Sequence, residues 1–144
     1  KEITNLLMPT NILMADKIIR NDLLYPELSY KIIGLLFEVS NEIGSGCLEK
    51  YYQKAAALSF REAGLKFKEQ VYVPFAFKNI KIGRCFLDFL VEDKIVLELK
   101  TNDRFSRQDI EQIYSYLKIN DLKLGILASF TSRGLKSKRI LNIN

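Results

Sequence analysis

The stretch from Gly83 to Lys100 places the strongest constraint on the fold. Two runs rich in β-branched, aromatic and aliphatic residues flank the polar break Glu92-Asp93-Lys94, which predicts two adjacent strands of a hairpin. Most side chains are apolar, so we expect the sheet to be covered on both faces. Charges inside a buried strand are unfavourable unless they are paired or bind a metal. Asp88, Glu98 and Lys100 therefore require partners.

The register of this hairpin decides whether Asp88 meets Glu98. Side chains alternate along a strand, so Glu98 and Lys100 share one face. A two-residue turn at Glu92-Asp93 pairs Asp88 with Leu97 and directs its side chain away from Glu98. A three-residue loop, Glu92-Asp93-Lys94, instead puts Asp88 opposite Glu98.

We predict the three-residue loop, which pairs Val91 with Ile95, because it also gathers the apolar side chains on one face. These are Leu87, Phe89, Val91, Ile95, Leu97 and Leu99. Asp88 and Glu98 then converge beside Lys100. Two carboxylates in this arrangement form an oxygen-ligand site for a divalent cation.

Composition limits the chemistry available to the chain. The 144 residues include no histidine, which excludes Ser-His and Cys-His nucleophiles and histidine-based metal sites. The two cysteines suggest neither a disulfide framework nor a zinc cluster. No apolar run approaches the ~20 residues that cross a bilayer, so we expect a single, cytoplasmic domain without a membrane partner.

The positive charge is concentrated late in the chain. Residues 1–99 hold 13 basic and 13 acidic residues, whereas residues 100–144 hold 9 basic and 4 acidic residues. This asymmetry fits an anionic partner such as nucleic acid, and it also fits an ordinary basic surface.

Periodicity and turn residues predict the remaining elements. Helices are expected over 11–24, 26–43 and 47–63 and from Ser106 onward. Strands are expected over 66–77, 82–91, 94–100 and 122–130, and residues 136–143 form either a last short strand or a tail. Gly64 is expected to end its helix, and Ser106 with Asp109 to form a capping box. Pro74 argues for an edge strand or a bulge, and a turn is expected at Asn79-Ile80-Lys81. The 11–24 helix either packs on the core or mediates oligomerisation, which leaves a homodimer open.

Two motifs resemble a known family. Asp88 followed by Glu98-Leu99-Lys100 resembles the PD-(D/E)xK nuclease motif, and Gly46-Cys47-Leu48-Glu49-Lys50-Tyr51-Tyr52 fits the signature of the prokaryotic GxxExxY proteins. The resemblance covers about residues 26–143. It implies an α/β fold with a three-layer, restriction-endonuclease-like core, in which helices flank a central mixed sheet. Residues 1–25 would be an extension and residues 26–144 a single nuclease-like domain.

The resemblance also implies site residues. Glu49 would stand beside the strand acids, and Gln112 would hold water, phosphate or Lys100. Mg²⁺ or Mn²⁺ would be bound by Asp88, Glu98 and the backbone carbonyl of Leu99. Glu49 would contribute through water or a second metal. Candidate phosphate contacts are Arg104, Arg107, Arg133, Lys136, Lys138 and Arg139.

The function implied is metal-dependent hydrolysis of phosphodiester bonds in nucleic acid, with DNA expected. No recognition helix or aromatic stacking platform stands out in the sequence, so we expect structure- or end-dependent cleavage rather than base-specific cleavage. An inactive nuclease-fold module that binds nucleic acid or protein is the alternative. A third interpretation is a purely structural ion pair between Lys100 and Asp88 or Glu98.

Overall fold

A five-stranded mixed sheet forms the centre of the molecule. The computed structural model describes residues 24–143. The strands lie in chain order: β1 (Phe67–Phe77), β2 (Ile80–Val91), β3 (Ile95–Lys100), β4 (Leu124–Thr131) and β5 (Gly134–Leu141). Neighbours are antiparallel except β3 and β4, which are parallel and joined through helix α4 (Arg107–Ile119). A parallel pair needs such a crossover.

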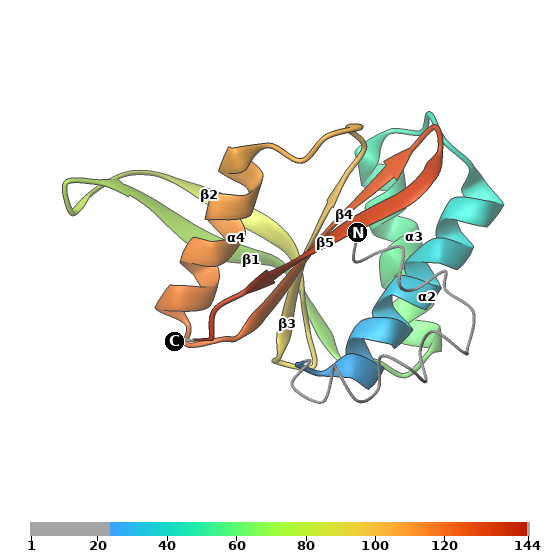
Figure 1. Ribbon diagram of the computed structural model, residues 1–144, viewed down its shortest axis with the longest axis horizontal. Coiled ribbons are helices and arrows are strands. Elements are labelled where there is room, and N and C mark those ends of the chain that lie inside the picture. The colour runs from blue at the N-terminus through green and yellow to red at the C-terminus, as the bar shows by residue number, and fades with distance from the viewer. Residues whose placement is uncertain (1–23, 144) are drawn as a thin grey trace.

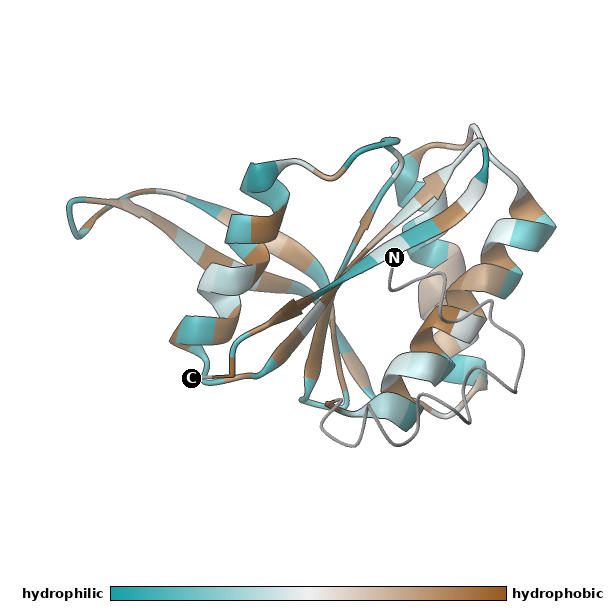
Figure 2. Ribbon diagram, viewed as in Figure 1, coloured by the Kyte–Doolittle hydropathy of each residue, from teal (hydrophilic) through white to brown (hydrophobic). Residues whose placement is uncertain are grey.

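Helices cover both faces of the sheet, as Figure 1 shows. On one face α2 (Pro26–Ile43) and α3 (Glu49–Glu62) pack over a cluster that includes Phe89, Leu97 and Leu99. On the other face α4 packs over a cluster that includes Leu90 and Val96. Apolar positions, brown in Figure 2, recur along the central strands and the helices. The predicted three-layer α/β/α architecture is confirmed.

Local sequence fixes two of the helix ends, as predicted. Gly64 adopts φ +78°, its N–H donates to Arg61, and the N–H of Leu65 donates to the carbonyl of Phe60. This is a Schellman motif, which satisfies carbonyls at the end of α3. At the start of α4, the Ser106 hydroxyl accepts from the Asp109 N–H at 3.0 Å and the Asp109 carboxylate accepts from the Ser106 N–H.

The β2–β3 hairpin has the predicted three-residue loop. Val91 pairs with Ile95 and Phe89 with Leu97. The prediction that Leu87 shares the face of Phe89 is wrong, because Leu87 packs in the α4 cluster whereas Phe89 packs under α2 and α3. The regular alternation breaks between them, at Asp88. Gln70, across from this point on β1, has φ +54° and is missing from the β1–β2 register.

The β1–β2 hairpin extends beyond α4 as a long arm, seen at the left of Figure 1. Its turn is Lys78-Asn79, with φ of +53° and +64°, and Phe77 pairs with Ile80. The turn predicted one residue later is therefore wrong. Two consecutive residues at positive φ form the tight turn whose twist matches a hairpin. Pro74 lies on the edge strand, next to a register shift at Phe75/Ala76.

Two further predictions concern the N-terminal helix and membrane-spanning segments. The helix predicted over 11–24 lies outside the described residues, apart from its last position. Among residues 24–143, no helix combines the length and the apolar character needed to cross a bilayer.

Gly125 determines how closely α4 approaches β4, and this gives a testable prediction. A Cβ at Gly125 would lie 2.3 Å from Cγ2 of Ile113, so Gly125→Ala should destabilise the fold by about 1–3 kcal/mol through overpacking. Gly34, inside α2, has open space around its Cβ position. Gly34→Ala should stabilise by roughly 0.5–1 kcal/mol. Urea unfolding of both variants measures the difference, and equal stabilities would contradict the packing argument.

Candidate functional site

Asp88 and Glu98 meet where β2 leaves β3. The Asp88 N–H donates to the Glu98 carboxylate (Oε1) at 3.0 Å, and the Leu99 N–H donates to Oδ2 of Asp88 at 2.8 Å. Immediately beyond the Phe89–Leu97 pair, these hydrogen bonds to side chains replace the backbone hydrogen bonds between the two strands. The two strands therefore hold two carboxyl groups against each other in a fixed geometry.

Burial of these two acids opposes their ionisation. Their exposed fractions are 5% for Asp88 and 7% for Glu98. Burial raises the pKa of Asp88, although the Leu99 N–H counteracts it, and burial together with the charge of Asp88 raises the pKa of Glu98 to about 8. A hydrogen bond between the two carboxyls favours the protonated form of Glu98. Two adjacent buried carboxyls cannot easily both ionise without added positive charge.

Lys100 supplies one positive charge beside the pair. Its ammonium lies 3.6 Å from Oε2 of Glu98 and 3.5 Å from Oδ1 of Asp109 on α4. Burial lowers the pKa of Lys100, but Glu98, Asp109 and Glu49 raise it by more, so the net pKa is raised. Lys100 is therefore a charged donor held between the sheet and the first turn of α4.

Glu49 approaches from the first turn of α3 and meets Asp88 through an amide. Nε2 of Gln53 donates to Oδ1 of Asp88 at 2.8 Å and to Oε2 of Glu49 at 3.4 Å, and Gln70 on β1 also reaches Asp88, at 3.5 Å. Burial raises the pKa of Glu49; Lys100 lowers it, and Asp88 and Asp109 raise it further. Within residues 24–143, no three acidic, cysteine or histidine side chains are grouped closely enough to hold a metal directly.

The residues of the 46–52 motif have separate structural tasks. Gly46 adopts φ +91° in the turn before α3, a conformation that favours glycine. Tyr52 is fully buried, its ring stacks on Phe130 with centroids 4.2 Å apart, and its hydroxyl donates to the Gly44 carbonyl. The turn and the tyrosine fix the start of α3. Glu49, between them in sequence, is thereby positioned beside the strand acids.

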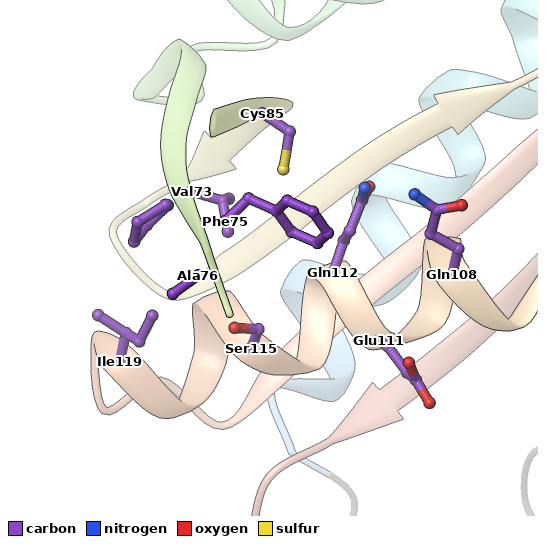
Figure 3. A pocket seen from close by; sticks show the side chains of 10 residues that line it. Val73, Phe75, Ala76, Cys85, Gln108, Glu111, Gln112, Ser115 and Ile119 are labelled. Carbon is purple, nitrogen blue, oxygen red and sulfur yellow. The ribbon is translucent and has the colours of Figure 1, made fainter. Parts of the chain in front are cut away.

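Gln112 lines a pocket to which none of the acids described above, nor Lys100, contributes a side chain. It lines a cavity of about 290 Å³ between α4 and the β1–β2 arm, together with Gln108, Phe75 and Cys85. Figure 3 shows its amide directed toward Phe75 and Cys85, with the Glu111 carboxylate directed away. Burial raises the pKa of Cys85, and the charge of Glu98 raises it further.

Five of the six predicted phosphate contacts lie at the surface, namely Arg104, Arg107, Arg133, Lys136 and Lys138. Lys136 contacts the carbonyl of Asp103 in the loop that follows Lys100. Arg139 differs, because it donates to Ser29 at 2.7 Å and to the carbonyl of Leu24 at 3.0 Å. It ties β5 to α2, and this explains its place in the fold without a nucleic acid.

Sequence reasoning missed three residues of the cluster. The sequence assigns Asp109 only to the helix cap, yet its second oxygen faces Lys100. Gln53 lies four residues after Glu49 on the same helix face, a spacing that could have indicated contact. Gln70 reaches Asp88 through the irregular backbone of β1, for which the sequence carries no signal.

Most of the chain matches a known protein family. The model of the PD-(D/E)XK nuclease superfamily matches residues 26–140. The chain belongs to the PD-(D/E)XK nuclease superfamily. Members of this superfamily are usually nucleases, and they generally use divalent metals such as Mg²⁺.

A solved structure shares the fold of this chain. The crystal structure of SSO0001 matches with a TM-score of 0.51 at 16% identity, over 99% of this chain and 67% of the other. At this identity the likeness shows the fold alone. No curated protein is significantly similar to the chain.

The acid cluster has the charge and the donors that a divalent cation requires. Four carboxyl groups interact electrostatically with the ammonium of Lys100: Glu98 and Asp109 in direct ion pairs, and Glu49 and Asp88 from farther away. This excess of negative charge contributes, with burial, to the raised carboxyl pKa values. Hard oxygen ligands of this kind suit Mg²⁺, so the residues fit the metal that the superfamily implies.

The orientation of Leu99 agrees with this fit. The N–H and C=O of one residue in an extended strand point toward the same neighbour. The Leu99 N–H points at Asp88, so its carbonyl lies on the same side of β3. That places a third oxygen donor at the edge shared by the two acids.

The raised pKa of Glu98 predicts how the stability of the metal-free protein depends on pH. Its folded-state pKa of about 8 exceeds the ordinary value of 4.5, so the protonated form favours the folded state. This contribution is complete below pH 4.5 and is lost as the pH rises through about 8. Thermal unfolding in chelator should show the midpoint falling over this range. Glu98→Gln, which cannot ionise, should flatten the dependence; an unchanged slope would contradict the assignment.

Proposed function

We propose that this protein is a metal-dependent nuclease that hydrolyses phosphodiester bonds of DNA in a structure- or end-dependent manner. The observation that supports the proposal is the excess of buried carboxyl groups around Lys100, at the edge where β2 separates from β3. A purely structural ion pair would need one acid for one lysine. Buried pairs are also poor stabilisers compared with apolar side chains.

Asp88, Glu98 and the carbonyl of Leu99 would hold Mg²⁺ or Mn²⁺. A bound divalent cation polarises a phosphoryl oxygen and lowers the pKa of a bound water. Glu49 is separated from Asp88 by the amide of Gln53, so it would act through water rather than as a direct ligand. Ligands must be ionised to bind, so metal binding would release the proton of Glu98.

Lys100 would orient the attacking water or stabilise the negative charge that develops on the phosphate. It need not lose its proton for either task, which agrees with its raised pKa. Asp109 is a positioning residue, since its contact holds the Lys100 ammonium at a fixed place over the acids. Gln112, on the pocket between α4 and the β1–β2 arm, would hold water or phosphate of the substrate.

Surface cations near the site would bind the substrate backbone. Lys100 pairs with Ser129, and Ser129 pairs with Lys136, so the three residues form a row across β3, β4 and β5. Arg104 and Arg107 follow in the loop and the first turn of α4. Such contacts fix position without reading base sequence, in keeping with structure-dependent action.

Within the superfamily we assign the chain to the GxxExxY proteins. The support is that Gly46 and Tyr52 fix the turn and the helix start, while Glu49 is presented to the acid pair. We also propose that residues 26–144 form one nuclease domain, with residues 1–25 as an extension.

Cleavage assays test the function directly. With Mg²⁺ or Mn²⁺ the protein should cleave at least one of single-stranded, duplex or branched DNA, and Glu98→Ala or Lys100→Ala should reduce the rate on the order of 10³-fold, because each removes several kcal/mol of transition-state stabilisation. Glu38→Ala and Lys123→Ala remove exposed charges of the same kinds and should leave the rate unchanged. Binding of all three substrates without cleavage would favour the inactive module.

The contact of Asp109 with Lys100 can be tested separately from the role of Asp109 in the helix cap. Asp109→Asn should lower kcat roughly tenfold and leave KM nearly unchanged, because it frees Lys100 in the transition state but removes no substrate contact. Ser106→Ala removes the cap at a cost of about 1 kcal/mol and leaves the Lys100–Asp109 contact in place. It should lower stability without lowering kcat. Equal kcat losses in the two variants would show that Asp109 serves the helix alone.

A further inference from the structure

The β1–β2 arm has an unusual surface composition. Between Gln70 and Asp88 the chain contains no acidic residue and three basic ones, Lys78, Lys81 and Arg84. The same segment exposes the aromatic side chains of Tyr72 (41%), Phe75 (50%), Phe77 (60%) and Phe86 (44%). Apolar positions continue along both strands of the arm (Figure 2). The arm is thus both cationic and aromatic, which is the composition of surfaces that bind nucleic-acid strands.

The strand register gathers part of this surface into one cluster. Tyr72 pairs directly with Phe86, and their rings lie edge to face with centroids 5.8 Å apart. The Lys81 ammonium lies 5.1 Å from the Tyr72 ring, and the Arg84 guanidinium lies 5.8 Å from the Phe86 ring. We call these four residues the arm cluster. Its members are spread over two strands, so the sequence alone did not show it.

The arm cluster lies on the face of the arm that α4 does not cover. Val71, Val73, Cys85 and Leu87 pack in the α4 cluster, and side chains alternate along a strand. Tyr72 and Phe86 therefore point to the opposite face.

The arm cluster lies close to Asp88 along both strands. Phe86 and Asp88 are two residues apart on β2, and Gln70, two residues before Tyr72 on β1, contacts Asp88 at 3.5 Å. The arm continues from Asp88 to Ile80, about 27 Å at the usual rise of a strand. A nucleic-acid strand that lies along the arm would therefore extend toward the end of the arm that carries Asp88.

We propose that the arm cluster binds a single strand of nucleic acid next to the scissile bond, with bases stacked on Tyr72 and Phe86 and phosphates on Lys81 and Arg84. This inference rests on the proposed nuclease function and specifies its substrate as one that has an unpaired segment. Unpaired bases expose the faces that aromatic side chains stack on, whereas bases in a duplex are already stacked.

Charge favours a nucleic acid over a second copy of the chain. Two arms that docked through this face would bring like charges together, without an acid on either arm between Val71 and Leu87. A phosphate backbone supplies the opposite charge at regular spacing.

Binding measured in chelator isolates the arm from catalysis. Fluorescence anisotropy with labelled dT and rU strands of about 12 nucleotides, at one fixed ionic strength, gives the affinity of the full chain. The double variant Tyr72→Ala/Phe86→Ala should bind both strands at least about tenfold more weakly, since it removes both of the rings on which bases would stack. Tyr72→Phe should retain the affinity. A second titration over a series of salt concentrations tests the cations: Lys81→Ala and Arg84→Ala should each reduce the slope of log affinity against log salt by about one phosphate contact.

Tyr51 provides the matched control. It is 49% exposed on α3, with the Lys50 ammonium 5.4 Å from its ring, so Tyr51→Ala should leave the affinity unchanged. The protein contains no tryptophan; Phe86→Trp would introduce a single reporter that a stacked base should quench, and Tyr51→Trp should not respond. This measurement needs no destabilising substitution.

Any one of three results would overturn the proposal. The folded double variant could bind with unchanged affinity, or the tryptophan fluorescence of the Phe86→Trp variant could remain unquenched at saturating oligonucleotide. The third result is light scattering that shows a dimer which Tyr72→Ala dissociates. Quenching by dT but not by rU would assign the face to DNA, and the reverse to RNA, with the proposal upheld in either case. Loss of cleavage in Glu98→Ala with binding intact tests the nuclease alone. If the unaltered protein binds strands but does not cleave them, the proposed nuclease function is contradicted, whereas the proposal that the arm binds single strands is retained.

Discussion

The exchange of hydrogen bonds between Asp88 and the Glu98–Leu99 segment is the constraint from which the site follows. One carboxylate accepts from the opposite backbone in each direction, so both acids are held where the two strands part. The same break in alternation puts Leu87 and Phe89 on opposite faces of the sheet. The fold thereby concentrates negative charge in a place from which water is largely excluded. Such charge is unfavourable by itself and becomes favourable when a cation is bound.

The elements around this point bring one group each to the cluster. The turn before α3 positions Glu49, and the first turn of α4 positions Asp109 against Lys100. Gly125 allows α4 to lie close to β4, which places that first turn near the end of β3. The β1–β2 arm begins at the same acids and carries a basic, aromatic face away from them. Asp88 therefore belongs both to the acid pair and to the base of the arm.

Much of this arrangement could be predicted from the sequence. Alternation and the apolar count selected the three-residue loop, and the capping box and Gly64 marked two helix ends. These features depend on neighbours within a few residues. The turn at Lys78-Asn79, the contact of Asp109 with Lys100, and the pairing of Tyr72 with Phe86 were not predicted. Each depends on strand register or on the packing of distant elements, which local patterns do not specify. The contact of Gln70 with Asp88 depends on a backbone irregularity in β1 that no residue type there predicts.

The most direct test of the account is the position of the metal. In a crystal of the protein soaked in Mn²⁺, anomalous scattering should place one ion in contact with the carboxylates of Asp88 and Glu98, with the Leu99 carbonyl as a further ligand and Glu49 linked through water. An ion bound elsewhere, or an acid pair that keeps its hydrogen bonds and excludes Mn²⁺ at saturating concentration, would contradict the central claim.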